Sequence, residues 1–377
     1  MTVHLSPVLA ELAQYPFARL DDWKAEAEGR GIELIDFGMG DPREVTPPFI
    51  REALLASVDA VSSYPRATGL PELREAIAGW IGRRFGVDVD PSTELVSTLG
   101  SKEAIFSFAQ LALGDRRVVA IPEPAYPVYE RGALFAGGTV VTVPLDERRG
   151  WLPDLDAFDA WDELALFWTC YPNNPTGAVA PLSFYEELAE RARAHGFLLC
   201  SDEAYSELWF DEPPVSALEV GDRTNVVVFN TLSKRSSMTG YRSGFVCAPG
   251  EIVEALRSFR PTVGTAPQEF VQRASAVAWS DDTHVDDVRA LYRRKRETLL
   301  PALLERGLRL AGSEATFYLW VEVGEPSEAF ARRLLEHGIV VAPGSFFGPA
   351  GDGYVRFALV PTEAECERAA TILREVL

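Results

Sequence analysis

The chain has 377 residues, of which 47% are hydrophobic and 24% charged, and its formal net charge is −20 at pH 7. This length predicts two or three domains, and the composition is typical of a globular protein with sizeable packed cores. Nucleic acids and anionic membranes are not expected as partners, because a surface of the same sign repels both.

The N-terminal residues MTVHLSPVLAELAQYPF contain no basic segment followed by an apolar block, so we expect no signal peptide. The longest nearly apolar run, residues 164–171, is far shorter than the roughly 20 residues of a membrane helix. The four cysteines lie far apart without a CxxC pair, and the four histidines show no metal-ligand spacing. We therefore expect reduced, structural thiols, no metal site and a cytoplasmic location.

The first strongly periodic segment, residues 70–86, predicts a helix with Pro71 near its first turn. Four of its apolar residues share one stripe: Leu73, Ile77, Trp80 and Ile81. Residues 99–113 predict the next helix, which begins at Gly100-Ser101-Lys102. Six short apolar runs predict buried strands: residues 117–122, 138–144, 165–170, 197–202, 225–230 and 243–249. Residues 183–196 predict a helix between two of them, and this alternation indicates a mostly parallel sheet covered on both faces.

The last hundred residues follow a different pattern. Residues 285–307 predict a long amphipathic helix, and the apolar runs after residue 317 predict a smaller α+β unit. We expect the first 45 residues or so to pack with that unit. The predicted organisation is a large α/β domain at residues 46–280 and a small α+β domain formed by residues 1–45 and 281–377, with a cleft between them.

Polar side chains follow three of the predicted strands. The turn YPNNPTG follows the strand that ends at residue 170, Asp202 and Tyr205 follow the next one, and Thr231, Ser233 and Lys234 follow a third. Each has an ordinary explanation by itself: a turn, a cap, a solvated lysine. Because the carboxyl ends of parallel strands meet at one edge of the sheet, where such folds bind ligands, their coincidence favours a binding site.

Three motifs together resemble the class I pyridoxal-phosphate-dependent aminotransferases of fold type I: NPTG at 174–177, SDEAY at 201–205 and TLSKRSSMTGYR at 231–242. The resemblance implies a mostly parallel seven-stranded sheet in the large domain, with pyridoxal 5′-phosphate as the cofactor. It also implies that Lys234 forms a Schiff base with the cofactor aldehyde and later acts as general acid and base. Its amine must be neutral for both tasks, so we expect neighbouring positive charge to lower its pKa.

The same resemblance implies the other contacts to the cofactor ring. Asp202 would pair with the pyridinium nitrogen, and Tyr205 and Asn174 would hold the ring oxygen O3′. Tyr126, in IPEPAYPVYE, would stack on the face of the ring.

For the cofactor phosphate, the resemblance implies Ser101 and Lys102 at a helix N-terminus, with Thr231 and Arg242. The distal acid of the substrate is the alternative partner of Lys102. Tyr64 would reach the phosphate of a neighbouring subunit, which implies a homodimer with shared active sites.

Amino acids and 2-oxo acids would be the substrates. Arg356, in GYVRFALV, would clamp the substrate α-carboxylate, and Gly38 and Asn174 would lie beside it. An arginine in an apolar strand is costly to bury unless it is paired, which favours a functional role.

The stretches LSKRS and RSGFV are most similar to the N-succinyldiaminopimelate aminotransferases of lysine biosynthesis. This implies ping-pong amino transfer between glutamate/2-oxoglutarate and N-succinyl-LL-2,6-diaminopimelate/N-succinyl-2-amino-6-oxopimelate. An alanine, aspartate or LL-diaminopimelate aminotransferase, or a pyridoxal-phosphate C–S lyase, is the alternative within the fold. A non-catalytic binding module is disfavoured because Lys234 and Asp202 are both present, and a nucleotide-binding protein because no GxGxxG or GxxxxGK[ST] loop occurs. The sequence assigns no contact to Arg235 or Tyr241, nor a residue that reads the distal end of the substrate.

Overall fold

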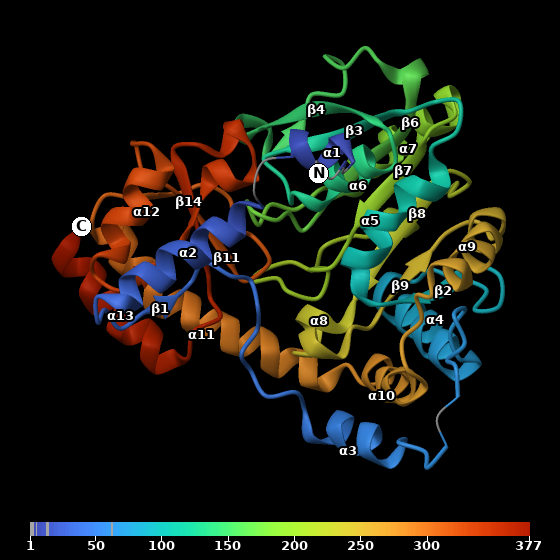
Figure 1. Cartoon of the computed structure of the whole chain (residues 1–377), viewed down its shortest axis with the longest axis horizontal. Coiled ribbons are helices and arrows are strands. Elements are labelled where there is room, and N and C mark those ends of the chain that lie inside the picture. Colours follow the sequence, from blue (N-terminus) through green and yellow to red (C-terminus); the bar gives the residue numbers. More distant parts are fainter. Residues whose placement is uncertain (1–3, 5, 13–14, 62) are drawn as a thin grey trace.

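The computed structural model describes residues 4, 6–12, 15–61 and 63–377 of the chain (Figure 1). Its main sheet has eight strands in the order β2-β9-β8-β7-β6-β3-β4-β5. Their bounds are β2 (Leu95–Thr98), β3 (Val118–Glu123), β4 (Thr139–Asp146), β5 (Leu152–Pro153), β6 (Leu164–Cys170), β7 (Leu198–Asp202), β8 (Val226–Thr231) and β9 (Gly244–Cys247). Strands β8, β7, β6, β3 and β4 are parallel neighbours, whereas β9 is antiparallel to both β8 and β2.

The mostly parallel sheet of fold type I is confirmed, with one more strand than the seven predicted. The additional strand is β5, whose two residues pair antiparallel with the end of β4 at the sheet edge. A strand this short leaves no periodic pattern in the sequence. Strand β2 was also absent from the predicted runs, because its four residues LVST are two apolar residues followed by two polar ones, which is neither an apolar run nor an alternation.

Helices cover both faces of this sheet, and alternate residues of one strand enter opposite cores. Val226 and Val228 of β8 pack with apolar residues of α4, α7 and α10, whereas Val227 and Phe229 pack with those of α5, α6 and α9. These helices are α4 (Pro71–Phe85), α5 (Gly100–Ala112), α6 (Val128–Phe135), α7 (Leu182–His195), α9 (Gly250–Val263) and α10 (Glu269–Ser280). Burial on both faces explains why the predicted strands are continuous apolar runs.

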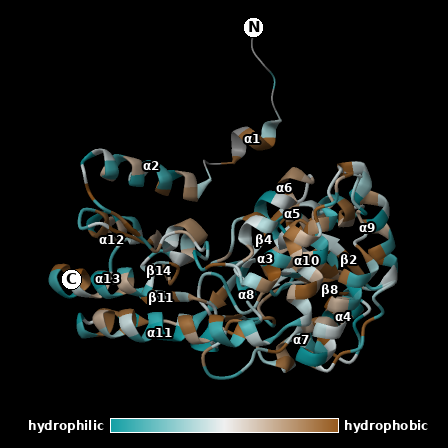
Figure 2. Cartoon of the chain, turned by 90° about the horizontal axis from the view of Figure 1, so that it is seen from below, coloured by the Kyte–Doolittle hydropathy of each residue, from teal (hydrophilic) through white to brown (hydrophobic). Residues whose placement is uncertain are grey.

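The N-terminal and C-terminal parts of the chain share a third core. A four-stranded antiparallel sheet in the order β10-β11-β14-β13 and a two-stranded parallel sheet of β1 and β12 belong to it. These strands are β1 (Ile35–Asp36), β10 (Arg309–Leu310), β11 (Tyr318–Glu322), β12 (Ile339–Val340), β13 (Ala342–Pro343) and β14 (Tyr354–Ala358). The helices around them are α2 (Pro16–Gly29), α11 (Thr283–Glu305), α12 (Ser327–Leu335) and α13 (Glu363–Val376). Figure 2 shows hydrophilic residues on α2, α11 and α13, whose apolar residues enter the core.

The remaining α-helices of the described residues are α1 (Pro7–Glu11), α3 (Pro48–Ala56) and α8 (Leu232–Arg235). The four cysteines are buried free thiols, as predicted. In the described part of the chain, no helix is long and apolar enough to cross a membrane.

Candidate active site

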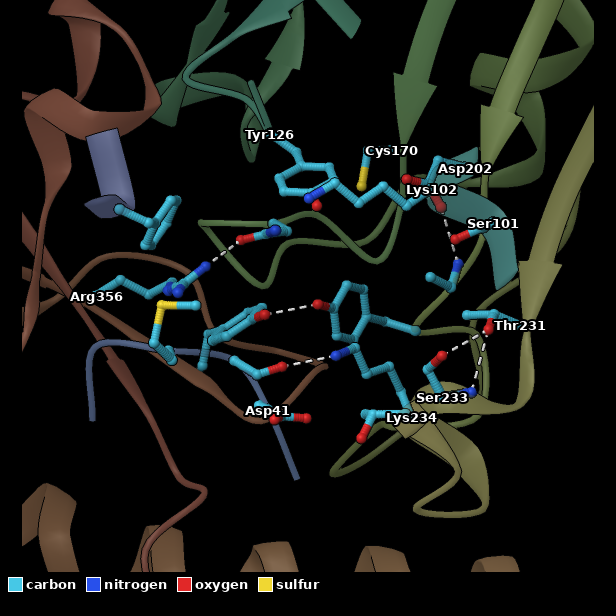
Figure 3. Close-up of a pocket in the computed structure, with 18 of the residues that line it drawn as sticks. Asp41, Ser101, Lys102, Tyr126, Cys170, Asp202, Thr231, Ser233, Lys234 and Arg356 are labelled. Carbon is cyan, nitrogen blue, oxygen red and sulfur yellow. Dashed lines mark hydrogen bonds between the residues drawn. The ribbon is translucent and has the colours of Figure 1, made fainter. Parts of the chain in front are cut away.

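A cavity of about 470 Å³ lies where the carboxyl ends of β6, β7 and β8 face the N-terminal and C-terminal segments (Figure 3). Ten of the twelve predicted site residues line it: Ser101, Lys102, Tyr126, Asn174, Asp202, Tyr205, Thr231, Lys234, Arg242 and Arg356. Gly38 is adjacent, because its carbonyl oxygen accepts a hydrogen bond from Arg356. The sequence therefore identified a set of residues that the fold brings together.

Lys234 lies on α8, the four-residue helix that directly follows β8. Thr231 caps this helix, since its hydroxyl oxygen accepts a hydrogen bond from the backbone N–H of Ser233 at 3.1 Å. The Lys234 Nζ donates to the carbonyl oxygen of Gly40 at 2.6 Å. The amine thus points across the cavity toward the N-terminal segment (Figure 3).

The pKa of Lys234 is lowered from 10.5 to about 8, in the direction that we predicted. Burial is the largest cause, and the charges of Arg356 and Arg242 lower the pKa further, against the opposing charge of Asp41. Neighbouring positive charge, the predicted cause, contributes to this shift but is not its largest cause. Removing the ammonium group from water destabilises its charged form more than the repulsion from these two guanidinium groups does.

Asp202 is the last residue of β7 and lines the cavity. Its Oδ2 accepts a hydrogen bond from the Tyr129 hydroxyl at 2.7 Å, and its Oδ1 accepts one from the backbone N–H of Ala204 at 3.2 Å. The pKa of Asp202 is raised to about 6. Burial is the largest cause, and these two hydrogen bonds and the charge of Lys234 offset part of its effect. Sequence analysis missed Tyr129, one of the two aromatic residues of α6, because nothing in the local sequence indicates its hydrogen bond to Asp202.

Arg356, on β14, is only 2% exposed. Its Nη1 donates to the Asn174 Oδ1 at 2.7 Å, its Nη2 donates to the Gly38 carbonyl oxygen at 2.8 Å, and its Nε is a buried atom without a hydrogen-bond partner among the described residues. The described residues include no carboxylate within 4 Å of its guanidinium nitrogens. A buried cation that lacks an anionic partner is expensive, so this site favours an anionic ligand.

Two tyrosine hydroxyls meet beside this arginine. The hydroxyl oxygens of Tyr205 and Tyr318 lie 2.6 Å apart, and the Arg356 guanidinium lies 4.2 Å from the centre of the Tyr318 ring. Tyr318 was not among the predicted site residues.

The N-terminus of α5 forms a second place for an anion. Gly100 begins the helix at φ +74°, a conformation that favours glycine, and a Cβ there would approach the Arg242 Nη2 to 2.8 Å, so Arg242 would have to shift. Ser101 and Lys102 follow in the first helical turn, whose backbone N–H groups have no partner within the helix. The Arg242 guanidinium, the Thr231 hydroxyl and these N–H groups are the donors that a phosphate group prefers.

Tyr64 does not reach the cavity of its own chain, and its side chain is completely exposed. Other exposed apolar residues lie near it in the sequence: Val45, Leu55, Val58 and Val61. Exposed apolar residues that cluster in one part of the chain favour a protein–protein contact.

Comparisons with known proteins agree with this geometry. The family model described as "Aminotransferase class I and II" matches residues 32–373. The chain belongs to this aminotransferase family. It is 41% identical to the LL-diaminopimelate aminotransferase of Aquifex aeolicus over 375 residues, which cover 97% of each protein.

Solved structures are similar over the whole aminotransferase fold. Substrate-bound BacF of Bacillus subtilis has a TM-score of 0.93 at 32% identity and covers 100% of this chain and 98% of that one. A probable N-succinyldiaminopimelate aminotransferase of Thermus thermophilus has a TM-score of 0.89 at 32% identity, over 96% of this chain and 100% of that one. These values extend the similarity to the main sheet and to the two smaller sheets, not only to the cofactor motifs.

The chain is therefore a transaminase of fold type I, and its cofactor is pyridoxal 5′-phosphate. The cavity fits that group by the chemistry of its side chains: a primary amine, a buried carboxylate, aromatic rings and an anion-binding helix N-terminus.

Proposed function

We propose that this aminotransferase exchanges an amino group between glutamate/2-oxoglutarate and N-succinyl-LL-2,6-diaminopimelate/N-succinyl-2-amino-6-oxopimelate in lysine biosynthesis. The observation that carries the reaction class is Arg356, a buried guanidinium at the cavity without a carboxylate partner among the described residues. It suits the α-carboxylate that every amino-acid and 2-oxo-acid substrate of a transaminase carries. Gly38 and Asn174, which accept its hydrogen bonds, would hold the guanidinium in a fixed orientation.

Lys234 is the proposed catalytic residue. Bound pyridoxal phosphate supplies an aldehyde that reacts with a primary amine and a ring that delocalises negative charge. With a pKa of about 8, the Lys234 amine is partly neutral at pH 7 and can attack a carbonyl carbon. Once released, the same amine can accept a proton from the substrate Cα and return one, as a general acid and base.

Four other residues are proposed to hold the cofactor ring. Asp202, kept ionised by the Tyr129 hydrogen bond, would pair with the pyridinium nitrogen. Tyr126 would cover one face of the ring, and Tyr205 and Asn174 would bind its oxygen.

The phosphate would be bound at the N-terminus of α5. Ser101 and Lys102 contribute the first helical turn, and Thr231 and Arg242 contribute a hydroxyl and a guanidinium. Tyr64 of a second copy would complete this site.

The choice of the N-succinyl substrate is supported by the charge at one end of the cavity. Lys102 Nζ lies 5.3 Å from the centre of the Tyr15 ring and 5.7 Å from that of Tyr126. The two carboxylates that line the cavity, Asp41 and Asp202, act electrostatically on Lys234 instead. The distal end of the succinylated substrate carries two carboxylates and no ammonium, whereas that of diaminopimelate carries one carboxylate and one ammonium. A cation at this end of the cavity therefore favours the succinylated substrate.

LL-diaminopimelate itself is the second candidate. It is favoured by the relative from Aquifex aeolicus, an LL-diaminopimelate aminotransferase that is 41% identical to this chain. The solved structure of the probable N-succinyldiaminopimelate aminotransferase is 32% identical.

A half-reaction screen distinguishes these substrates. The cofactor-loaded enzyme is mixed separately with glutamate, N-succinyl-LL-diaminopimelate, LL-diaminopimelate, alanine and aspartate, and the visible absorbance of the cofactor is followed. We expect conversion with glutamate and the succinylated compound. Conversion with LL-diaminopimelate at least as fast as with its succinyl derivative would transfer the assignment to the second candidate.

The covalent role of Lys234 has a separate test. Borohydride reduction of the loaded enzyme should leave a pyridoxyl mass on the peptide that contains Lys234, and Lys234→Ala should not be labelled. A pyridoxyl mass on another lysine would contradict the proposed role.

We further propose that the protein is a cytoplasmic homodimer with shared active sites, in which residues 46–280 form the large domain and residues 1–45 and 281–377 the small one. The complete exposure of Tyr64 and of apolar residues near it in the sequence supports the dimer. Mixing Lys234→Ala with Tyr64→Phe should restore part of the activity, because one site of each mixed dimer would contain both native residues. A fully active monomer in sedimentation would refute the dimer.

A further inference from the structure

The two residues after Lys234 point away from the cavity, and the functional proposal assigns them no role. Arg235 is 1% exposed and Ser236 is 0% exposed. Both contact the junction between α10 and α11, beside which α8 lies (Figure 1). One short segment therefore offers an amine to the cavity and embeds its next two side chains in the protein.

Arg235 has an extensive set of contacts for a buried side chain. Its guanidinium lies 4.8 Å from the centre of the Trp279 ring and 5.7 Å from that of Trp80. Its Nη1 donates to the Ala278 carbonyl oxygen at 2.9 Å, and its Nη2 donates to Asp282 Oδ1 at 3.1 Å and to the Asp281 carbonyl oxygen at 3.3 Å. A planar fork that donates in two directions while it lies against aromatic rings is specific to arginine.

The same guanidinium connects α8 to the segment that carries Asp202. Arg235 Nε lies 3.7 Å from Glu207 Oε1, which also accepts a hydrogen bond from Trp80 Nε1 at 2.6 Å. Glu207 follows Asp202 by five residues, and its Oε2 lies 3.6 Å from Arg84 Nε and 3.5 Å from Arg289 Nη1. One buried carboxylate thus faces three guanidinium groups from three different segments.

Ser236 provides a second attachment to the same junction. Its Oγ lies 2.8 Å from His284 Nε2, and His284 Nδ1 lies 2.7 Å from Asp281 Oδ1. Asp281 therefore contacts Ser236 through the imidazole side chain and Arg235 through its own carbonyl oxygen.

We propose that Arg235, assisted by Ser236, is a positioning residue for Lys234. A helix of four residues cannot hold its own orientation in water, so the position of the Lys234 amine depends on what the neighbouring side chains bind. Arg235 ties α8 to α10 and to Glu207, and Ser236 ties it to His284 at the start of α11. The amine is thereby held in fixed relation to Asp202, at the other end of the proposed ring site.

This inference rests on the proposed role of Lys234 and is tested with Arg235→Lys, which retains the charge but loses the fork. The maximal rate of the half-reaction with glutamate should fall about 10- to 100-fold, as for a reacting group displaced by about 1 Å. The glutamate concentration for half-maximal rate should change less than about twofold, because Arg356 is untouched. Hydrogen–deuterium exchange of the apoprotein should be faster in the peptide spanning residues 230–242.

Leu334→Ala is the matched control. Leu334 is completely buried in the C-terminal core, so its truncation destabilises the fold without contacting α8. It should lower the unfolding temperature while the half-reaction rate and the exchange of residues 230–242 stay at the parent values. If Arg235→Lys lowers the unfolding temperature but leaves both of those readouts unchanged, Arg235 is a structural residue only and the proposal is overturned.

Ser236→Ala decides the question if Arg235→Lys does not fold. It removes one hydroxyl, so the protein should fold, exchange faster at residues 230–242 and react more slowly; parent values for both would overturn the proposal. Borohydride labelling distinguishes failure of the positioning role from failure of the proposed function. A pyridoxyl mass on Lys234 with unaffected Arg235 and Ser236 variants would refute the positioning role alone, whereas its absence from Lys234 would refute the proposed function.

Discussion

Replacing Lys234 by methionine should stabilise the protein in its cofactor-free form at pH 7. Lys234 carries a pKa of about 8 in the folded state because its amine is buried, against 10.5 as its ordinary value. Below pH 8 both the folded and the unfolded chain hold the proton, and the folded state bears the full cost of the buried charge. Between pH 8 and 10.5 only the unfolded chain holds it, so stability rises with pH across this window.

The size of the effect follows from the same two pKa values. A fall from 10.5 to about 8 corresponds to about 3 kcal/mol at roughly 1.4 kcal/mol per tenfold change in proton affinity. This is an upper value, because the open cavity admits solvent that screens the charge. Methionine has a similar length and no charge, so Lys234→Met should recover most of this free energy at pH 7 and little of it above pH 10.

The measurement is urea unfolding of the two cofactor-free proteins at a series of pH values from 7 to 10.5. Other titrating groups cancel in the difference between them. Lys24→Met is a control with the opposite expected effect. Burial alone would lower the pKa of Lys24, but the nearby Asp21 and Asp36 raise it overall. Removing this charge should therefore destabilise the protein at pH 7. A Lys234→Met protein no more stable than its parent at pH 7, or a difference that does not shrink with pH, would refute the reasoning.

Three other substitutions test the remaining parts of the site. Arg356→Ala should raise the KM for every amino donor about 10- to 100-fold in steady-state assays, because the substrate α-carboxylate loses its proposed charged hydrogen-bond donor. Tyr129→Phe removes a donor that lowers the pKa of Asp202, so that pKa should rise and the acid limb of the rate–pH profile should move to higher pH. Gly100→Ala should weaken cofactor binding at least about 10-fold in equilibrium dialysis, because it combines backbone strain with a contact of 2.8 Å to Arg242.

The glycine prediction has a matched control in the same chain. Gly86 has φ +68° at the end of α4, and a Cβ there would meet nothing within 4 Å. Gly86→Ala should therefore cost stability without changing cofactor affinity. Equal loss of affinity in both variants would mean that backbone strain, not the contact with Arg242, is responsible. Unchanged KM values in Arg356→Ala, or an unmoved acid limb in Tyr129→Phe, would contradict the other two predictions.

Elements with a strong local pattern were predictable from the sequence. The run at 225–230 is apolar at successive positions because β8 is buried on both faces, and the stripe at Leu73, Ile77, Trp80 and Ile81 is buried as one side of α4. Strand β5 was not predictable, because two residues carry no period. The site residues were predictable as a set because they occupy strand ends and helix starts, which parallel topology brings to one edge.

Contacts between distant segments were not predictable. Tyr129 and Asp202 are 73 residues apart, and nothing near either residue indicates that they are joined by a hydrogen bond. The sequence assigns no partner to Arg235. In the fold it contacts Glu207, Trp80 and Trp279, which come from three other parts of the chain.

The sequence by itself determined the alternation of strands and helices, the three motifs and the residue types that the chemistry requires, because each is a property of neighbouring positions. Only the tertiary structure decided what those residues experience. Burial depends on every segment that packs around a group, so only the fold makes desolvation the main cause of the lowered Lys234 pKa. The fold also leaves Arg356 as a buried guanidinium without a carboxylate beside it among the described residues.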